Sequence, residues 1–206
     1  MRKPVAFLLA SFAASVLIAS CGSSGTTQND DAENKPGDTT SAKAAFGDAD
    51  VEFAQGMIPH HRQAVEMAEL APTRAQSPQV KELAAQIKRA QDPEIKTMSG
   101  WLRSWGEEVP EDTGDTGMDH GGMDMGEDMP GMMSGEQMAD LEAANGADFD
   151  RMFMELMIDH HEGAIEMAET EQRDGENTAA KKLAATIEKA QTAEIAQMRK
   201  LLANSG

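Results

Sequence analysis

An internal repeat is the feature that most constrains the fold of this chain of 206 residues. Residues 50–102 align with residues 150–202 without a gap, and about two positions in five are identical. Each copy carries the pattern Met-x-x-His-His-x5-Met, which begins at Met57 in the first copy and at Met157 in the second. Apolar residues recur at helical spacing through both copies, so each copy predicts two helices that share an apolar face. Because such a pair cannot bury that face alone, the two copies are expected to pack together.

Capping residues and helix breakers give the expected boundaries. In the first repeat, about 44–106, Asp48 or Asp50 is expected to cap the first helix, and Ser77 followed by Pro78 begins the second. In the second repeat, about 134–206, a short helix begins at a capping box and precedes two long helices. The prediction is an all-α fold, in which two αα-hairpins form a four-helix bundle joined by a long Met-rich crossover at residues 111–133.

The repeated motif lies on the apolar side of its helix. At about 100° per residue, both histidines and both methionines of each copy fall on that side, whereas Glu66 and Glu69 face the opposite way. Four buried imidazoles are costly unless they share a purpose, and metal ligation is one that imidazole and thioether groups can share. Hydrogen-bonded core histidines are the alternative, and for the methionines core packing is an equally good explanation. The candidate metal ligands are His60, His61, His160, His161, Met57, Met67, Met157 and Met167.

Each copy also places a glutamine and a glutamate on the inward face of its second helix. Polar side chains that face a core need hydrogen-bond partners, and an imidazole N–H is one. These residues are expected to hold the imidazoles in place from behind rather than to bind the metal themselves. They are Gln91, Glu94, Gln191 and Glu194.

The crossover contains a second candidate site. Six methionines stand among glycines and aspartates, where core packing does not explain so many apolar side chains. Thioether sulfur is a soft ligand that favours Cu(I), and a histidine adds a ligand that either oxidation state of copper accepts. An oxidisable flexible spacer is the alternative. The residues of this accessory metal loop are Met118, His120, Met123, Met125, Met129, Met132 and Met133.

The N-terminus has the features of an exported lipoprotein. Two basic residues, a short apolar run and the sequence Ile-Ala-Ser-Cys21 predict a signal peptide at residues 1–20 that is cleaved before a lipidated Cys21. An ordinary signal peptide with a stray cysteine is the alternative. Residues 21–43 are polar and non-periodic, so they are expected to form a disordered tether. The formal charge of −18 argues against nucleic acid as a partner.

The repeated pattern Phe-x3-Met-Ile-x-His-His-x2-Ala-x2-Met-Ala, at residues 53–68 and 153–168, resembles the bacterial domain-of-unknown-function family 305. The resemblance implies a ferritin-like helical bundle in an exported protein that is linked to copper binding and tolerance. It points to the four motif histidines and four motif methionines named above. In the first copy Pro59 stands where the second copy has Asp159, so the two halves of the site are expected to differ.

These features favour a copper-binding protein over an enzyme. It would sequester or buffer copper, with Cu(I) favoured over Cu(II), while a lipid at Cys21 anchors it to the outer face of the bacterial cytoplasmic membrane. A ferritin-like di-iron oxidase is the first alternative, but that chemistry uses glutamate three residues before histidine, and no motif histidine has one. The second alternative is a structural or interaction module without metal.

Overall fold

The computed structural model describes residues 45–111 and 129–204. Within these ranges the chain forms five helices and no named strand: α1 (Asp48–Arg74), α2 (Pro78–Trp105), α3 (Gly135–Ala143), α4 (Gly146–Asp174) and α5 (Thr178–Ala203). The predicted all-α bundle is confirmed. None of the described helices is long and apolar enough to cross a membrane. The predicted signal peptide, Cys21, the tether and the loop residues Met118, His120, Met123 and Met125 lie outside the described residues.

The helix ends follow the capping chemistry of the sequence with one change. Asp50 does not cap α1 itself; the cap is Gly47, whose N–H donates to the Asp50 carboxylate at 2.7 Å. Ser77 caps α2 as predicted, and α2 ends at Gly106 with φ 89°, a left-handed conformation that glycine adopts without strain. The capping box before α3 is also present, between Ser134 and Gln137.

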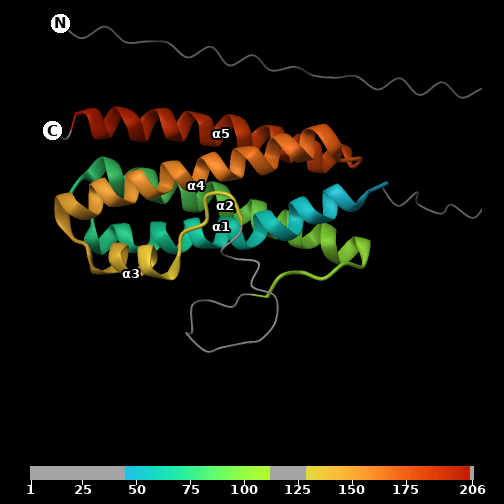
Figure 1. Ribbon diagram of the computed structural model, residues 1–206, viewed down its shortest axis with the longest axis horizontal. Coiled ribbons are helices and arrows are strands. Elements are labelled where there is room, and N and C mark those ends of the chain that lie inside the picture. The colour runs from blue at the N-terminus through green and yellow to red at the C-terminus, as the bar shows by residue number, and fades with distance from the viewer. Residues whose placement is uncertain (1–44, 112–128, 205–206) are drawn as a thin grey trace, which may run out of the picture. The chain divides into compact units, whose positions relative to one another are not determined.

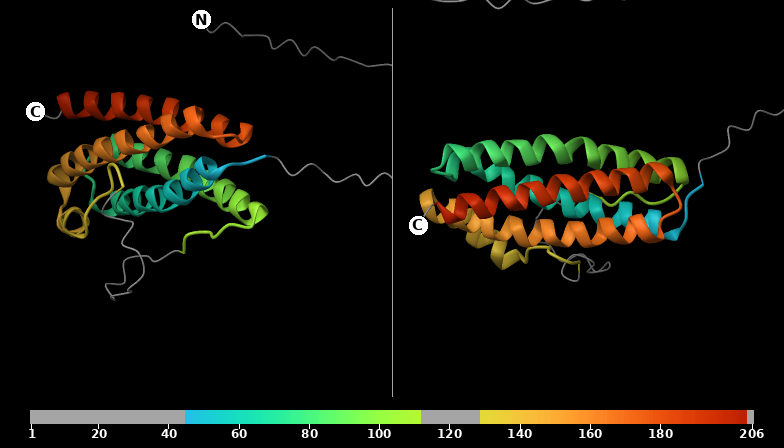
Figure 2. Two further views of the ribbon diagram at one scale, coloured as in Figure 1. Left: turned by 45° about the vertical axis from the view of Figure 1, so that its right-hand side comes forward. Right: turned by 90° about the horizontal axis from the view of Figure 1, so that it is seen from above.

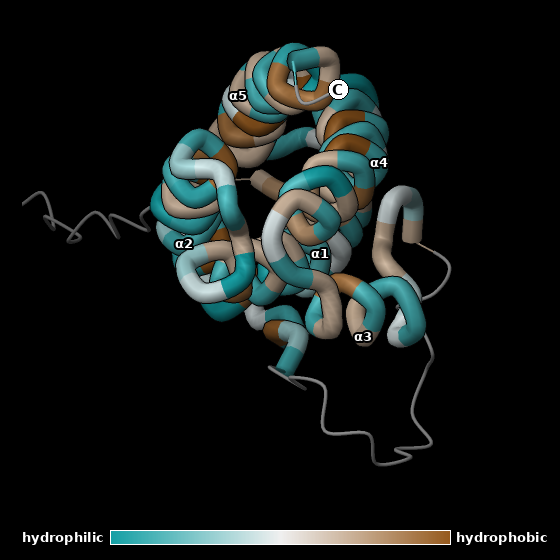
Figure 3. Tube along the Cα trace, turned by 90° about the vertical axis from the view of Figure 1, so that its left-hand side faces the viewer, coloured by the Kyte–Doolittle hydropathy of each residue, from teal (hydrophilic) through white to brown (hydrophobic). Residues whose placement is uncertain are grey.

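The four long helices run side by side as two hairpins, α1 with α2 and α4 with α5 (Figures 1 and 2). The hairpins meet mainly where α1 packs against α4, and α3 lies on the outside of this pair (Figure 3). The helices carry apolar residues toward the space between them, as the view along the bundle shows.

The core consists of two apolar clusters, and α1 and α4 each pass through both. The first half of α1, including Phe53 and Met57, joins Ala164 and Ala168 from the second half of α4. The second half of α1 joins the first half of α4, including Phe153, in the other cluster. The two helices are therefore antiparallel, and both His-His pairs fall where each helix changes from one cluster to the other.

Two aspartates at equivalent positions tie the hairpins together. Asp150, near the start of α4, accepts hydrogen bonds from the Gln76 and Ser77 N–H groups in the α1–α2 turn, at 3.1 and 2.8 Å. Asp50, near the start of α1, accepts from the Glu176 and Asn177 N–H groups in the α4–α5 turn, at 3.2 and 2.9 Å. We call these contacts the reciprocal clasps. They fix the register of α1 against α4.

Candidate metal centre

All four motif histidines lie in the middle of the bundle, and each is 0% exposed. They come from the facing sides of α1 and α4. The rings of His60 and His160 touch, with centroids 3.7 Å apart and planes inclined by 40°. The ring centroid of His161 is 6.4 Å from that of His160. The antiparallel packing of the two repeats thus gathers residues a hundred positions apart into one histidine cluster.

A glutamate from the partner helix of each hairpin orients one histidine. The His61 Nε2–H group donates to Glu94 of α2 at 2.8 Å, and the His161 Nε2–H group donates to Glu194 of α5 at 2.7 Å. Both glutamates are partly exposed, while both rings are buried. Since the proton of a neutral ring stays on the nitrogen that donates, Nδ1 is left as a lone pair inside the core.

The other two histidines are bound differently. The His60 Nε2–H group donates to the carbonyl oxygen of Pro130 at 3.1 Å, which leaves its Nδ1 as the free nitrogen. Neither ring nitrogen of His160 has a hydrogen-bond partner among the described residues, and the same holds for Nδ1 of His60, His61 and His161. Buried polar atoms without partners are rare in folded proteins, so a cluster of them indicates a ligand site.

Burial keeps the touching rings uncharged. Burial, with a smaller contribution from the nearby His61, lowers the pKa of His60 to about 3, although the hydrogen bond to the Pro130 carbonyl acts in the opposite direction. Burial also holds the pKa of His160 well below its ordinary value, and His60 adds to this effect. A neutral imidazole is the form that binds a metal ion, so these two rings need not lose a proton at neutral pH.

The motif methionines divide into three buried side chains and one partly exposed. Met57, Met67 and Met157 are fully buried, whereas Met167 is only partly buried. Met57 and Met157 each lie one helical turn before a histidine of the cluster, His61 and His161, on the same side of the helix. In both halves of the bundle, therefore, a buried methionine lies one turn before a histidine of the cluster.

Gln91 of α2 and Gln191 of α5 are buried in the core. Neither side-chain amide has a hydrogen-bond partner among the described residues. The sequence placed them with the glutamates behind the imidazoles. Only Glu94 and Glu194 make that contact.

Residues 129–133, which we call the strap, cover the histidine cluster from the side of α1 and α4. The strap is held by Gln63, whose side chain accepts from the Met133 N–H at 2.7 Å and donates to the Met133 carbonyl at 2.9 Å. A β-carbon on Gly163 of α4 would overlap the Pro130 carbonyl, so this close approach requires glycine.

The strap corrects one prediction and adds residues that sequence reasoning missed. Met133 was counted among the loop methionines that core packing does not explain, but it is 8% exposed and belongs to the apolar core. Core packing therefore explains why an apolar residue stands at this position, and its role as a metal ligand stays a prediction. The roles of Gln63, Pro130 and Gly163 were missed. Glycine in the middle of α4 was the available signal, because it weakens a helix unless another chain segment lies against it.

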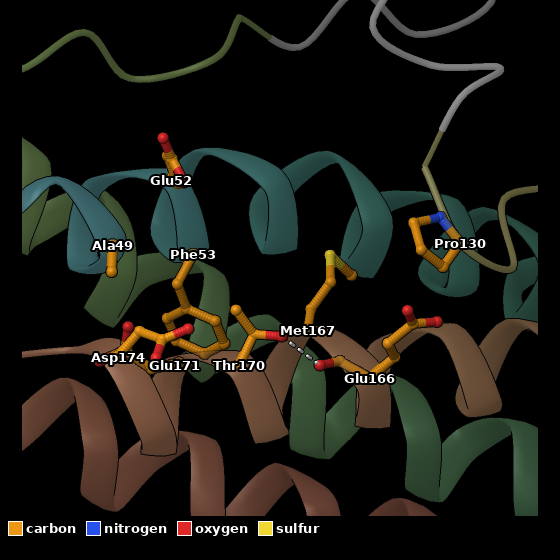
Figure 4. A pocket seen from close by; sticks show the side chains of 9 residues that line it. All are labelled: Ala49, Glu52, Phe53, Pro130, Glu166, Met167, Thr170, Glu171 and Asp174. Atoms are coloured by element: carbon orange, nitrogen blue, oxygen red, sulfur yellow. Dashed lines mark hydrogen bonds between the residues drawn. The ribbon is translucent and has the colours of Figure 1, made fainter.

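A groove of about 400 Å³ opens between α1 and α4 beside the strap (Figure 4). The Met167 side chain rises from α4 toward α1, between Phe53 and Pro130. Exposed carboxylates give the groove a negative rim, which attracts cations. Its lining residues are Ala49, Glu52, Phe53, Pro130, Glu166, Met167, Thr170, Glu171 and Asp174.

The donor set fits a soft or borderline metal ion. In the part of the chain that the structure describes, no three His, Cys, Asp or Glu side chains are grouped so that they could hold one ion. Imidazoles acting in pairs, with thioether sulfur completing the set, remain as the available donors. That combination suits Cu(I), whereas magnesium and calcium require mainly oxygen ligands.

The fold and the site define a helical-bundle protein with a buried cluster of imidazoles and with buried methionines one turn away on the same helices. The chain belongs to the DUF305 family, a domain of unknown function whose family model matches residues 50–202. No curated protein matches the chain.

Solved structures of the same family are similar over most of the chain. A DUF305 protein from Streptomyces coelicolor is 34% identical, with a TM-score of 0.66, over 77% of this chain and 94% of that one. CopM in its Cu(II)-bound form is 36% identical, with a TM-score of 0.62, over 75% of this chain and 96% of that one. CopM has also been solved in Cu(I)-bound and Ag-bound forms.

Proposed function

We propose that this chain is an exported copper-binding lipoprotein that sequesters or buffers copper and has no enzymatic activity. Copper is its cargo, with Cu(I) the favoured oxidation state, and a lipid at Cys21 anchors it to the outer face of the cytoplasmic membrane. The likeness to CopM, solved with Cu(II), Cu(I) and Ag bound, supports copper as the metal. The lipobox-like sequence before Cys21 supports the anchor.

The observation that carries the proposal is the set of buried ring nitrogens. Three of the four rings have Nε2–H bound to a carboxylate or a carbonyl, so that Nδ1 is free. A carboxylate behind a metal-binding imidazole is a recurrent arrangement, because it fixes the tautomer and raises the basicity of the ligand nitrogen. Burying four imidazoles for packing alone would leave these nitrogens without partners at a cost in stability.

The thioethers favour Cu(I) over harder ions. Met57 and Met157 are buried on the same helix faces as the histidines, and sulfur prefers soft ions. A di-iron centre instead requires several carboxylates facing the ion. Glu94 and Glu194 instead accept hydrogen bonds from the Nε2–H groups of His61 and His161. They therefore orient the rings.

The test is a titration of the purified chain with Cu(I) against a chromogenic Cu(I) chelator. The variant is His60→Asn with His160→Asn, which keeps a polar group at both positions, and a second variant replaces all four motif histidines by Ala. Met98→Leu with Met198→Leu is the matched control, because these buried methionines are equivalent in the two repeats and lie outside the motif. Circular dichroism establishes that each variant stays helical.

The expected result is that the histidine variants lose the tightest Cu(I) site while the control retains it. Unchanged Cu(I) stoichiometry and affinity in a folded histidine variant would overturn the proposal. Anaerobic addition of iron followed by oxygen tests the oxidase alternative, for which an oxo-bridged iron chromophore is the positive result.

A further inference from the structure

The strap brings a second methionine close to Met167. A β-carbon placed on Gly56 of α1 would lie 3.6 Å from the Met129 sulfur and 3.6 Å from the Met167 sulfur. The two sulfurs are therefore separated by at most twice that distance. Methionine has three rotatable side-chain bonds, so two thioethers this close can converge on one ion without movement of the backbone.

The helix register places this pair next to the histidine cluster. Gly56 precedes His60 by one turn on α1, and Met167 follows Gly163 by one turn on α4. The strap spans both turns, since Met129 lies against Gly56 while the next residue, Pro130, contacts His60 and Gly163. On α1 the sulfurs thus lie at the level of Gly56, one turn or roughly 5 Å along the axis from His60, while on α4 Met167 follows His160 by about two turns.

The two repeats differ at this position. Met67, the counterpart of Met167, is fully buried in the apolar core, and the counterpart of Gly56 is Leu156. Met167 instead lines the groove with the acidic rim, and Met129 is partly exposed beside it. Core packing accounts for Met67, but it accounts less well for two flexible apolar side chains at the edge of a groove.

We propose that Met129 and Met167 form a separate two-thioether site for a soft monovalent ion, Cu(I), at the mouth of the groove. The acidic rim attracts the cation, the thioethers select a soft one, and His60 of the histidine cluster follows one turn along α1. Copper passing from outside to the buried imidazoles would meet this site first. The inference rests on the proposed copper-binding function, and it adds an outer site to the buried one.

The experiment follows the ε-methyl groups of all methionines by NMR in the full chain while Ag(I), a redox-inert soft ion, is added. Single Met129→Leu and Met167→Leu variants assign the two signals and remove one sulfur each with little change in packing. Met138→Leu is the matched control, because Met138 is partly buried against the core on α3, away from the groove.

The expected result is that the Met129 and Met167 signals shift together. Met129→Leu removes a direct ligand, so it should weaken the Ag(I) response of Met167 by at least the roughly tenfold that loss of an outer-shell partner costs. Met138→Leu should leave the response unchanged. An Ag(I) response of Met167 that is the same with and without Met129 would overturn the two-thioether site.

The histidine variants separate this outcome from failure of the proposed function. If His60→Asn with His160→Asn loses the buried site and the paired methyl shifts persist, both proposals stand. If the wild-type chain binds Cu(I) at the histidines and Met129→Leu changes nothing, only the outer site is wrong. If the wild-type chain binds neither ion, the proposed function and the outer site both fail.

Discussion

His60 and His160 occupy matching positions in the repeat, yet their rings have different surroundings. The His60 ring is tied to the Pro130 carbonyl, while the His160 ring has no hydrogen-bond partner among the described residues. The difference arises from the strap, which belongs to neither copy of the repeat. His61 and His161, whose hydrogen-bond partners belong to the repeats, bond to equivalent glutamates in the two halves. Identical motifs therefore give two equivalent rings and two that differ.

Replacing Glu94 by Ala should weaken copper binding without removing it. The carboxylate holds His61 with Nδ1 toward the core, and loss of such a partner commonly lowers metal affinity about 10- to 100-fold. The variant should also lose about 1–3 kcal/mol of stability, because a buried N–H is left unpaired. Chelator competition and urea unfolding measure the two effects. Glu82→Ala, an exposed change on the same helix, is the control; equal affinities in both variants would contradict the orienting role.

Glu171 is a buried carboxyl that the sequence did not single out. It is 1% exposed, and its side chain lies next to the Asp50 carboxylate. Burial, a hydrogen bond to Asp50 and the charge of that carboxylate together raise the pKa of Glu171 to about 8. Burial also opposes the charge of Asp50, but hydrogen bonds from the N–H groups of Gly47, Asn177 and Glu176 outweigh it and lower the pKa of Asp50. Asp50 therefore stays charged while Glu171 stays protonated.

The raised pKa of Glu171 predicts that stability falls as the pH rises. Between its ordinary pKa of 4.5 and its pKa of about 8 in the fold, the folded chain holds a proton that the unfolded chain has released. Glu171→Gln, which cannot ionise, should flatten the decline in melting temperature between about pH 5 and about pH 9. Glu169→Gln, an exposed change two residues away, should leave the decline as it is. Parallel wild-type and Glu171→Gln curves would show that Glu171 is not the titrating group.

At the scale of the elements, the position of the strap depends on Gly163 far more than on Gly56. A methyl group on Gly163 would overlap the Pro130 carbonyl, whereas a methyl on Gly56 would make ordinary contact with two flexible methionines. Gly163→Ala should displace the strap and destabilise the chain, despite the better helix propensity of alanine. Gly56→Ala should stabilise it by up to about 1 kcal/mol. Urea unfolding and hydrogen exchange of the Met133 amide measure both effects; protection of that amide in Gly163→Ala equal to the wild type would contradict the close contact.

The helices and their inward faces were predictable from the sequence, because periodicity, caps and the repeat all indicate the same arrangement. The burial of His60, His61, His160 and His161 follows from that periodicity. The strap was not predictable. Its position depends on contacts of Pro130 and Met133 with helices many residues away, and short segments without periodicity carry no signal for such contacts. For the same reason Met133 was assigned to the loop rather than to the core.

For the whole molecule, copper binding and folding should be coupled. The histidine cluster exists only when α1 and α4 pack together, so an ion held there binds the folded chain and not the unfolded one. Free Cu(I) at about a hundred times its dissociation constant should add about 2.7 kcal/mol to the free energy of unfolding. For a chain of this size that amounts to roughly 5 to 10 °C in melting temperature. Anaerobic calorimetry with and without Cu(I) measures the shift, and its absence would favour the metal-free module.

The reciprocal clasps have a consequence for the ancestry of the chain. Each repeat supplies an aspartate for the turn of the other, so a lone repeat would carry one half of each contact and satisfy both by pairing with a second copy around a twofold axis. Duplication and fusion of the gene for such a homodimer would produce the repeat and the reciprocal contacts of the present chain. Two fused halves can differ in sequence, whereas the two chains of a homodimer cannot. The first repeat has Gly56 and Gln63 where the second has Leu156 and Gly163, so that one glycine on each side makes room for the strap while Gln63 holds it.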